Sequence, residues 1–214
     1  SDLVDLEQAR ILHWPLLRKA WRAFQAAPQG SLGEAFATFC AEQREWLDDY
    51  ALFVALKQAH AGRAWTEWES GYRDHQLPAL DQARKAYADE IGLQQFLQWC
   101  FHRQWAALRT AAAERGIGLI GDLPIFVSHD SADVWAHREL FELDDQGHCS
   151  AVAGVPPDYF SADGQHWGNP LYRWDLHRAP PYRWWIARFS RLLQLFDAVR
   201  VDHFIGFHRY WSIP

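Results

Sequence analysis

Two short apolar segments in the second half of the chain constrain its fold more than any other feature. Residues 117–127 have the sequence IGLIGDLPIFV, and residues 198–201 have the sequence AVRV. Short apolar runs of this kind are typical of strands that are buried in a parallel sheet. Residues 182–196 precede the second run and have helical spacing, so they predict the crossover helix that parallel strands require. The pattern favours an α/β fold.

The connection between these predicted strands is far longer than a crossover needs. Asp122 and Asp202 stand at the two strand ends and are 80 residues apart, whereas a strand–helix–strand unit needs only about 30 residues. We therefore expect residues 128–175 to form a long insertion above the strand ends. It is rich in Gly, Pro, Asp and aromatic residues. Parallel α/β barrels place their substrate contacts in loops at this end of the strands.

Within this insertion the sequence predicts a few local structures. Residues 141–148 favour a hairpin with a Gln-Gly pair near its turn. Asp130 or Ser131 is expected to cap a short helix, which explains this acidic stretch better than a metal site does. Residues 154–161 and 165–170 predict loops.

Residues 1–115 predict helices, because their apolar residues recur at helical spacing. Pro15 is expected to open a second helix at its first turn. Ser31 and Glu34 fit a capping box that begins the next helix. Further helices are expected at about 45–60, 78–91 and 93–114, ending at Gly62, Gly92 and Gly116. We therefore divide the chain into a mainly helical subdomain, residues 1–115, and an α/β part, residues 116–214.

Composition excludes several classes of protein. The net charge is −6 and no Lys/Arg run exceeds two residues, which argues against binding to nucleic acids or anionic membranes. No stretch of 18 apolar residues is present, so no membrane span is expected. Cys40, Cys100 and Cys149 are scattered and odd in number, which favours free thiols and a cytoplasmic location. The sequence has no phosphate-binding or dinucleotide-binding glycine motif, and we expect neither a cofactor nor a metal.

Paired charges stand at the ends of the two predicted strands. Alternation along a strand places Arg200 and Asp202 on the same face. A guanidinium favours the ionised form of a carboxylate beside it, and retaining glycosidases use an ionised carboxylate as their nucleophile. Asp122 is expected to face the same pocket. Taken alone, however, the Arg-Val-Asp tripeptide favours a buried structural ion pair, and Asp122 equally fits a helix cap. Both interpretations stay open at this point.

Tryptophan occurs 13 times in the chain. Flat aromatic faces suit sugar rings, because the C–H surfaces of a sugar pack well against them. An aromatic-rich core explains any single tryptophan at least as well.

Five long motifs in the same order resemble the amylomaltase family of bacterial and plant 4-α-glucanotransferases. The motifs are GDLPIFV at 121–127, DSADVW at 130–135, VAGVPPDYFS at 152–161, WGNPLY at 167–172 and RVDHF at 200–204. The likeness extends upstream to about residue 45. It implies part of a (β/α)8 TIM barrel with a large helical insertion subdomain, two core strands and a lid at about 128–175. It also implies transfer of α-1,4-glucan segments between maltooligosaccharides or maltodextrins.

The resemblance implies a role for each matching residue. Asp202 is the nucleophile, Arg200 orients it, and Asp122 and His203 bind the donor sugar. Residues 156–164 form a lid over the cleft. The lid and the wall beside it supply the remaining substrate contacts, namely Asp158, Tyr159, Phe160, Gln165 and Trp167.

The resemblance also implies that this chain is the central part of a longer enzyme. The family's acid/base Glu is expected beyond residue 214, and further barrel segments are expected on both sides of the chain. We therefore expect the isolated chain to be inactive. Two other functions remain compatible with the residues: an α-amylase-like hydrolase, or a helical module that binds glucans without catalysis.

Overall fold

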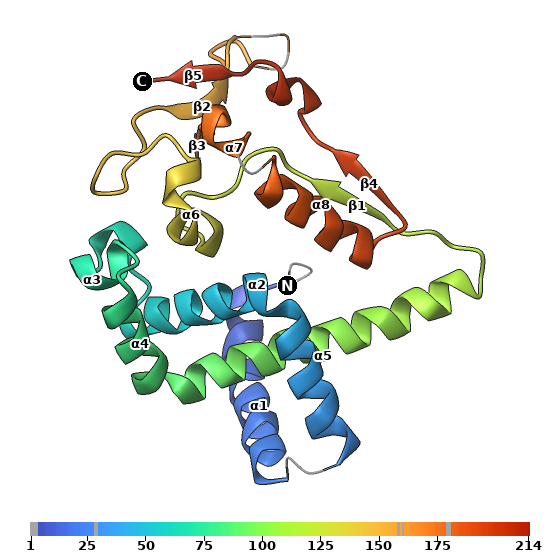
Figure 1. The fold of residues 1–214 in the computed structure, drawn as a ribbon. Helices are drawn as coiled ribbons and strands as arrows, with labels where there is room; N and C mark the ends of the chain where they lie inside the picture. Colours follow the sequence, from blue (N-terminus) through green and yellow to red (C-terminus); the bar gives the residue numbers. More distant parts are fainter. Residues whose placement is uncertain (1–3, 28–29, 158, 160, 179–180) are drawn as a thin grey trace.

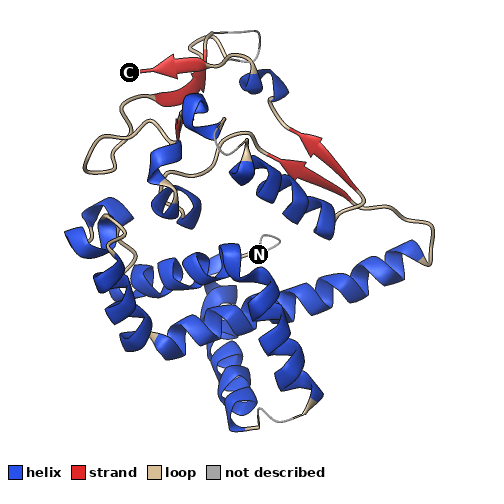
Figure 2. Cartoon of the chain, in the orientation of Figure 1, coloured by secondary structure: helices blue, strands red, loops and turns tan. Residues whose placement is uncertain are grey.

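The computed structural model describes all residues except 1–3, 28–29, 158, 160 and 179–180. The chain forms a helical region from its first half, and two small sheets with short helices from its second half (Figures 1 and 2). The main helices are α1 (Leu6–Ala26), α2 (Ser31–Ala59), α4 (Leu77–Ala86), α5 (Ala88–Ala113) and α8 (Arg183–Leu195). Shorter helices are η1 (Trp65–Glu67), α3 (Ser70–Arg73), α6 (Ala132–Ala136), η2 (Arg138–Leu140), α7 (Trp174–His177) and η3 (Phe204–Phe207). No helix among the described residues is long and apolar enough to cross a membrane.

The helical region confirms the predicted class of structure but corrects two helix starts. Pro15 lies inside α1 and does not open a second helix. The residues around it are exposed, so water can satisfy the carbonyl that a proline leaves without its helical donor. Ser31–Ala59 form one helix, α2, and the capping box is wrong. Gly30 is the N-cap with a φ of +93°, and no side chain caps this helix.

Gly92 does not end a helix, contrary to the expectation. The boundary falls at Tyr87 instead, and α5 runs through Gly92. A Cβ atom at this position would lie 2.7 Å from the Trp21 ring. The glycine therefore allows α1 and α5 to pack closely around a buried indole, which offsets the low helix propensity of glycine.

Two hydrophobic clusters hold the chain together. The smaller cluster lies among α1, α2 and α5 and contains Trp21, Phe39, Leu47, Leu93, Phe96 and Trp99. The larger cluster joins the end of α2, through Leu52 and Leu56, to Trp135 and Tyr172 of the second half. Because each buried large side chain contributes about 1.5–3 kcal/mol, this shared cluster couples the helical region strongly to the strands.

The strands β1 (Ile120–Leu123) and β4 (Ala198–Val201) pair in parallel, as predicted. The expected burial is wrong, because exposed residues alternate with buried ones in β1 and with half-buried ones in β4. Helix α8 precedes β4 and lies against both strands (Figure 1). Asp122 pairs in register with Arg200. The predicted crossover therefore brings the two halves of the candidate charge cluster to the same level of the sheet.

A second, antiparallel sheet corrects the prediction of loops in the insertion. It consists of β2 (Val152–Val155), β3 (Gln165–Pro170) and β5 (Trp211–Ile213), in the order β3-β2-β5. The segments of β2 and β3 lack the alternation of apolar and polar residues that marks a strand. Their pairing comes from tertiary structure, because the edge partner β5 comes from the very end of the chain.

The local structures of the insertion follow the sequence more closely. Leu143 and Cys149 form an antiparallel bridge, and the Asp144 carboxylate accepts hydrogen bonds from two backbone amides in the turn between them. Ser131 caps α6 by accepting a hydrogen bond from the Val134 amide. Asp130 instead pairs with Lys57 of α2 at 2.6 Å. The predicted hairpin and helix cap are confirmed.

The β1–β4 pair is anchored at its first residues by Asp197. Its carboxylate accepts hydrogen bonds from the Leu119 amide at 2.8 Å and from the Arg109 guanidinium at 2.5 Å. Both hydrogen bonds lower the pKa of Asp197, and the one from the Leu119 amide has the larger effect. A carboxyl group with a lowered pKa stabilises the folded chain at any pH above its pKa in the unfolded chain. This stabilisation is lost as the pH falls through its pKa in the folded chain.

We predict that Asp197→Asn lowers the urea midpoint of the chain most at neutral pH. The gap between the wild type and the variant should be full above about pH 5 and should narrow as the pH falls below the unfolded value of about 3.9, because the wild-type carboxylate is then progressively protonated. Urea titrations at intervals between pH 3 and pH 7 measure the gap. A gap that stays constant over this range would contradict the assignment.

Candidate functional site

Three charged side chains meet at the ends of β1 and β4. The Arg200 guanidinium lies 3.5 Å from the Asp122 carboxylate through Nε, and it donates a short hydrogen bond through Nη2 to Oδ1 of Asp202. The strand register explains the arrangement, since Asp122 lies opposite Arg200 and Asp202 follows one residue beyond β4. The structure thus brings together all three charges that the sequence analysis paired.

These charges face solvent. The Arg200 side chain is 62% exposed, and the Asp122 and Asp202 side chains are 55% and 52% exposed. A buried structural ion pair is therefore wrong, and Asp122 is a strand residue and not a helix cap. Exposed ion pairs contribute about 0–1 kcal/mol to stability. The ion pairs therefore add little to the free energy of unfolding, and they leave two carboxylates and a cation accessible to a ligand.

His203 and Trp167 bring the second sheet to this cluster. His203 has a φ of +49°, and its ring meets the Trp167 indole edge-on with centroids 5.0 Å apart. Trp167 lies on β3, and its Nε1 donates to the Gln165 side chain at 3.0 Å. The structure therefore places Gln165 and Trp167 of β3 beside His203, which follows β4.

The segment that follows β1, residues 124–127, packs under this site; we call it the strap. Its Phe126 ring lies 6.1 Å from the Trp167 ring. The Asn169 side chain, from β3, donates to the Val127 carbonyl at 2.8 Å. The sequence analysis missed the strap as a functional element. Its signals were its place after β1 and its inclusion in the GDLPIFV motif at 121–127.

Gly206 makes the close packing of the strap and the His203 turn possible. The residue is buried, and a Cβ atom there would lie 2.7 Å from Cδ1 of Ile125 and 3.1 Å from Cδ2 of His203. The sequence analysis gave Gly206 no role.

The structure describes the predicted lid only in part. Its base is defined, because Val155 of β2 pairs with Gln165 of β3, and residues 156–164 therefore form the loop between these strands. Tyr159 is 97% exposed. Asp158 and Phe160, two further predicted contacts, lie outside the described residues.

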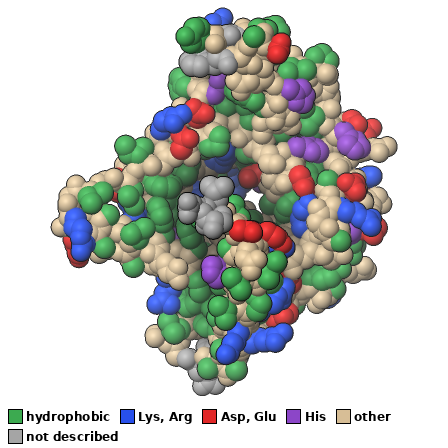
Figure 3. All heavy atoms as spheres, turned by 180° about the vertical axis from the view of Figure 1, so that it is seen from behind, with side chains coloured by type: hydrophobic (Ala, Val, Ile, Leu, Met, Phe, Trp, Pro, Cys, Tyr) green, Lys and Arg blue, Asp and Glu red, His purple; other side chains and the backbone are tan. Residues whose placement is uncertain are grey.

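The chemistry of the cluster is that of carboxylates and aromatic rings. No group of three or more His, Cys, Asp and Glu side chains among the described residues could hold a metal ion. On the face drawn in Figure 3, the Lys and Arg side chains of the described residues are scattered among acidic and hydrophobic ones. Carboxylates beside a guanidinium and an indole are typical of sites that process sugars.

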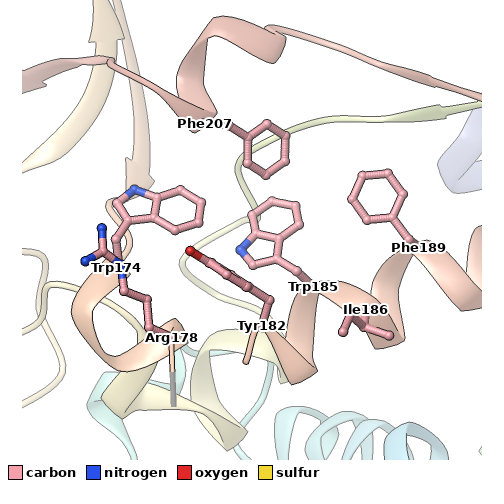
Figure 4. Close-up of a pocket in the computed structure, with 7 residues that line it drawn as sticks. All are labelled: Trp174, Arg178, Tyr182, Trp185, Ile186, Phe189 and Phe207. Carbon is pink, nitrogen blue, oxygen red and sulfur yellow. The ribbon is translucent and has the colours of Figure 1, made fainter. Parts of the chain in front are cut away.

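A separate cavity of about 430 Å³ lies behind the turn that follows Asp202. Figure 4 shows aromatic rings from α7, α8 and η3 around it, with the Arg178 side chain at one side. The lining residues are Trp174, Arg178, Tyr182, Trp185, Ile186, Phe189 and Phe207. None of the predicted site residues lines this cavity.

Comparisons with known proteins agree with this class of site. A family profile described as 4-alpha-glucanotransferase matches residues 1–214. A 4-alpha-glucanotransferase from Thermus thermophilus is 51% identical over 201 residues, covering 94% of this chain and 40% of that protein. A 4-alpha-glucanotransferase from Synechocystis is 45% identical over 212 residues, covering 99% of this chain and 42% of that protein.

A solved structure is similar in fold over nearly the whole chain. The amylomaltase from Streptococcus agalactiae, in complex with acarbose, matches with a TM-score of 0.92 and 37% identity, covering 98% of this chain and 42% of that one. The chain therefore belongs to the 4-alpha-glucanotransferase family. It spans about 40% of the length of the curated relatives named above.

We predict that Gly206→Ala destabilises the chain by about 1–3 kcal/mol, because the methyl group must displace Ile125 or the His203 ring. Gly118→Ala is the matched control. Gly118 has no positive φ, and its Cβ atom would meet only an Asp197 oxygen at 3.9 Å. Urea unfolding measures both variants. Equal free energies of unfolding for the two variants would contradict the packing role of Gly206.

Proposed function

We propose that this chain is part of a 4-α-glucanotransferase that moves α-1,4-glucan segments between maltooligosaccharides. The observation that carries the proposal is the solvent-facing Asp122–Arg200–Asp202 cluster in a member of this family. A similar protein has been solved with acarbose bound, which supports an α-glucan ligand. The three free cysteines support a reducing compartment such as the cytoplasm.

Asp202 is the nucleophile in this proposal. Its carboxylate attacks the anomeric carbon of the donor glucan, the bond to the leaving sugar breaks, and a covalent glucosyl ester forms. The 4-hydroxyl of a second glucan then displaces the carboxylate and restores the α configuration. Arg200 orients Asp202 through the hydrogen bond to Oδ1. The anion also stabilises the positive charge of the oxocarbenium-like transition state.

The neighbouring residues bind the sugar. Asp122, held beside Arg200, and His203, held against Trp167, would contact the donor glucose. Gln165 and Trp167 would form the wall of the cleft. Asp158, Tyr159 and Phe160 belong to the β2–β3 loop, which would cover the glucan and favour a sugar over water as the acceptor.

A retaining enzyme also needs an acid/base carboxyl group about 5–5.5 Å from the nucleophile. We propose that a Glu outside this chain supplies it. We also propose that residues 116–214 contribute two strands to a (β/α)8 barrel, with residues 1–115 as its helical insertion. The parallel β1–β4 pair with the α8 crossover supports this assignment, as does the share of the relatives that the chain covers. The isolated chain is then inactive.

We predict that Asp202→Asn abolishes glucan transfer in the longer polypeptide that contains this chain. Maltotriose is the substrate, and product chain lengths are followed by chromatography. The wild type should give glucose and a ladder of longer glucans with few new reducing ends. The variant should be slower by about 10³-fold or more, because the amide is a very weak nucleophile.

Asp81→Asn is the control, because Asp81 is an exposed aspartate of α4 that pairs with Arg84 of the same helix and lies outside the candidate site. Its transfer rate at neutral pH should stay within about twofold of the wild type. An Asp202→Asn variant that keeps more than a tenth of the wild-type rate contradicts the assignment of the nucleophile. Growth of reducing ends without longer products contradicts transfer itself.

A further inference from the structure

The strap, residues 124–127, has an irregular backbone, yet it lies between several parts of the candidate site. It follows Asp122 and Leu123 of β1 directly. Its Phe126 contacts Trp167, and its Ile125 packs against Gly206 in the turn after Asp202. A shift of the strap would therefore move Asp122, Trp167 and the turn that contains His203 together.

Arg188 of α8 holds the strap by its backbone. Its Nη2 donates to the Pro124 carbonyl at 3.1 Å, and its Nη1 donates to the Ile125 carbonyl at 3.4 Å. The Tyr172 hydroxyl donates to the same Ile125 carbonyl at 2.6 Å. The planar fork of a guanidinium fixes the relative positions of two consecutive carbonyls, which a single donor does not.

The Arg188 guanidinium is itself held in place. It lies 4.9 Å from the ring centroids of both Trp184 and Trp185, two indoles of its own helix that meet nearly at right angles. Both indoles belong to the larger hydrophobic cluster. Burial lowers the pKa of Arg188, so the surroundings tolerate its charge at some cost. Removing a cation from water costs free energy, and two hydrogen bonds to backbone carbonyls recover only part of it. We take this cost as a sign that the position of the strap matters.

We propose that Arg188 is a positioning residue for glucan binding. It connects the rigid helix α8 to the strap and thereby sets the positions of Asp122 and Trp167 for the donor sugar. The inference rests on the proposed function. Arg188 lies apart from the charge cluster and takes no part in the chemical step, so its loss should affect KM more than kcat.

Arg191 provides a matched control on the same helix. Its guanidinium lies 4.7 Å from the Trp46 ring and donates to the Gln43 side chain at 3.2 Å. Burial lowers its pKa as well. It resembles Arg188 in charge and in stacking, but it donates to Gln43 of α2 and to Gln194 of its own helix and not to the strap. A difference between equivalent variants at the two positions therefore reports on the strap.

The first measurement is steady-state kinetics with maltotriose on the longer polypeptide that contains this chain. Arg188→Met should raise KM about tenfold and change kcat by less than about threefold, because misplaced binding groups weaken substrate binding. Arg188→Lys should restore part of the loss, since an ammonium reaches one carbonyl but lacks the fork. Arg191→Met should leave KM within about twofold.

The second measurement is backbone hydrogen exchange without substrate, so its outcome does not depend on the proposed function. The Asp202 amide donates a hydrogen bond at 2.9 Å to the carbonyl of Leu123, the residue directly before the strap. Exchange at this amide should accelerate at least tenfold in Arg188→Met and stay unchanged in Arg191→Met. If Arg188→Met fails to fold, Tyr172→Phe replaces it, because this change removes one donor to the Ile125 carbonyl and leaves the core volume nearly unchanged. Exchange at the same amide should accelerate in that variant.

Different failures separate the two ideas. A wild type without transfer activity overturns the proposed function and leaves the exchange result to judge the role of Arg188. Unchanged exchange at the Asp202 amide in Arg188→Met, or the same KM change in Arg188→Met and Arg191→Met, overturns the positioning role.

Discussion

The parallel pairing of β1 and β4 is the constraint on which the rest of the structure depends. Four residue pairs in register place Asp122 opposite Arg200, and Asp202 comes directly after the last pair, Leu123 and Val201. In parallel strands, equivalent ends meet at the same edge, and side chains two residues apart share a face. The pairing alone therefore assembles two carboxylates around one guanidinium. Because this cluster is half exposed, its stabilising contribution is small, and its position has to be fixed by neighbouring groups.

Aromatic packing supplies that fixed position. The larger hydrophobic cluster runs from α2 through the insertion to α8, so the helical region and the strands do not move independently. The antiparallel sheet then brings Trp167 against His203, and the strap joins this contact to β1. Each of these contacts links segments that are far apart in the sequence. The candidate site is consequently a property of the packed chain and not of any single motif.

The sequence predicted the parts of this arrangement that depend on neighbouring residues along the chain. The two parallel strands follow from short apolar runs, although they are less buried than predicted; the Ser131 cap follows from its side chain, and the charge cluster from alternation next to Asp202. The antiparallel sheet was missed because β2 and β3 lack alternation and pair with a segment at the end of the chain. Gly92 was misjudged because its packing against Trp21 leaves no local signal. Arg188 was invisible for a similar reason, since the carbonyls that it binds belong to every residue type. The roles of Asp158 and Phe160 rest on the resemblance alone.

The central claim is that Asp202 forms a covalent bond with the donor sugar. The most direct measurement is to trap that ester in the longer polypeptide with a fluorinated α-glucosyl fluoride, which slows the second step more than the first. Proteolysis and mass spectrometry then locate the added mass. The account predicts a single labelled peptide containing Asp202, and loss of the label when maltotriose is added as acceptor. A label on any other carboxylate, Asp122 included, would contradict the account.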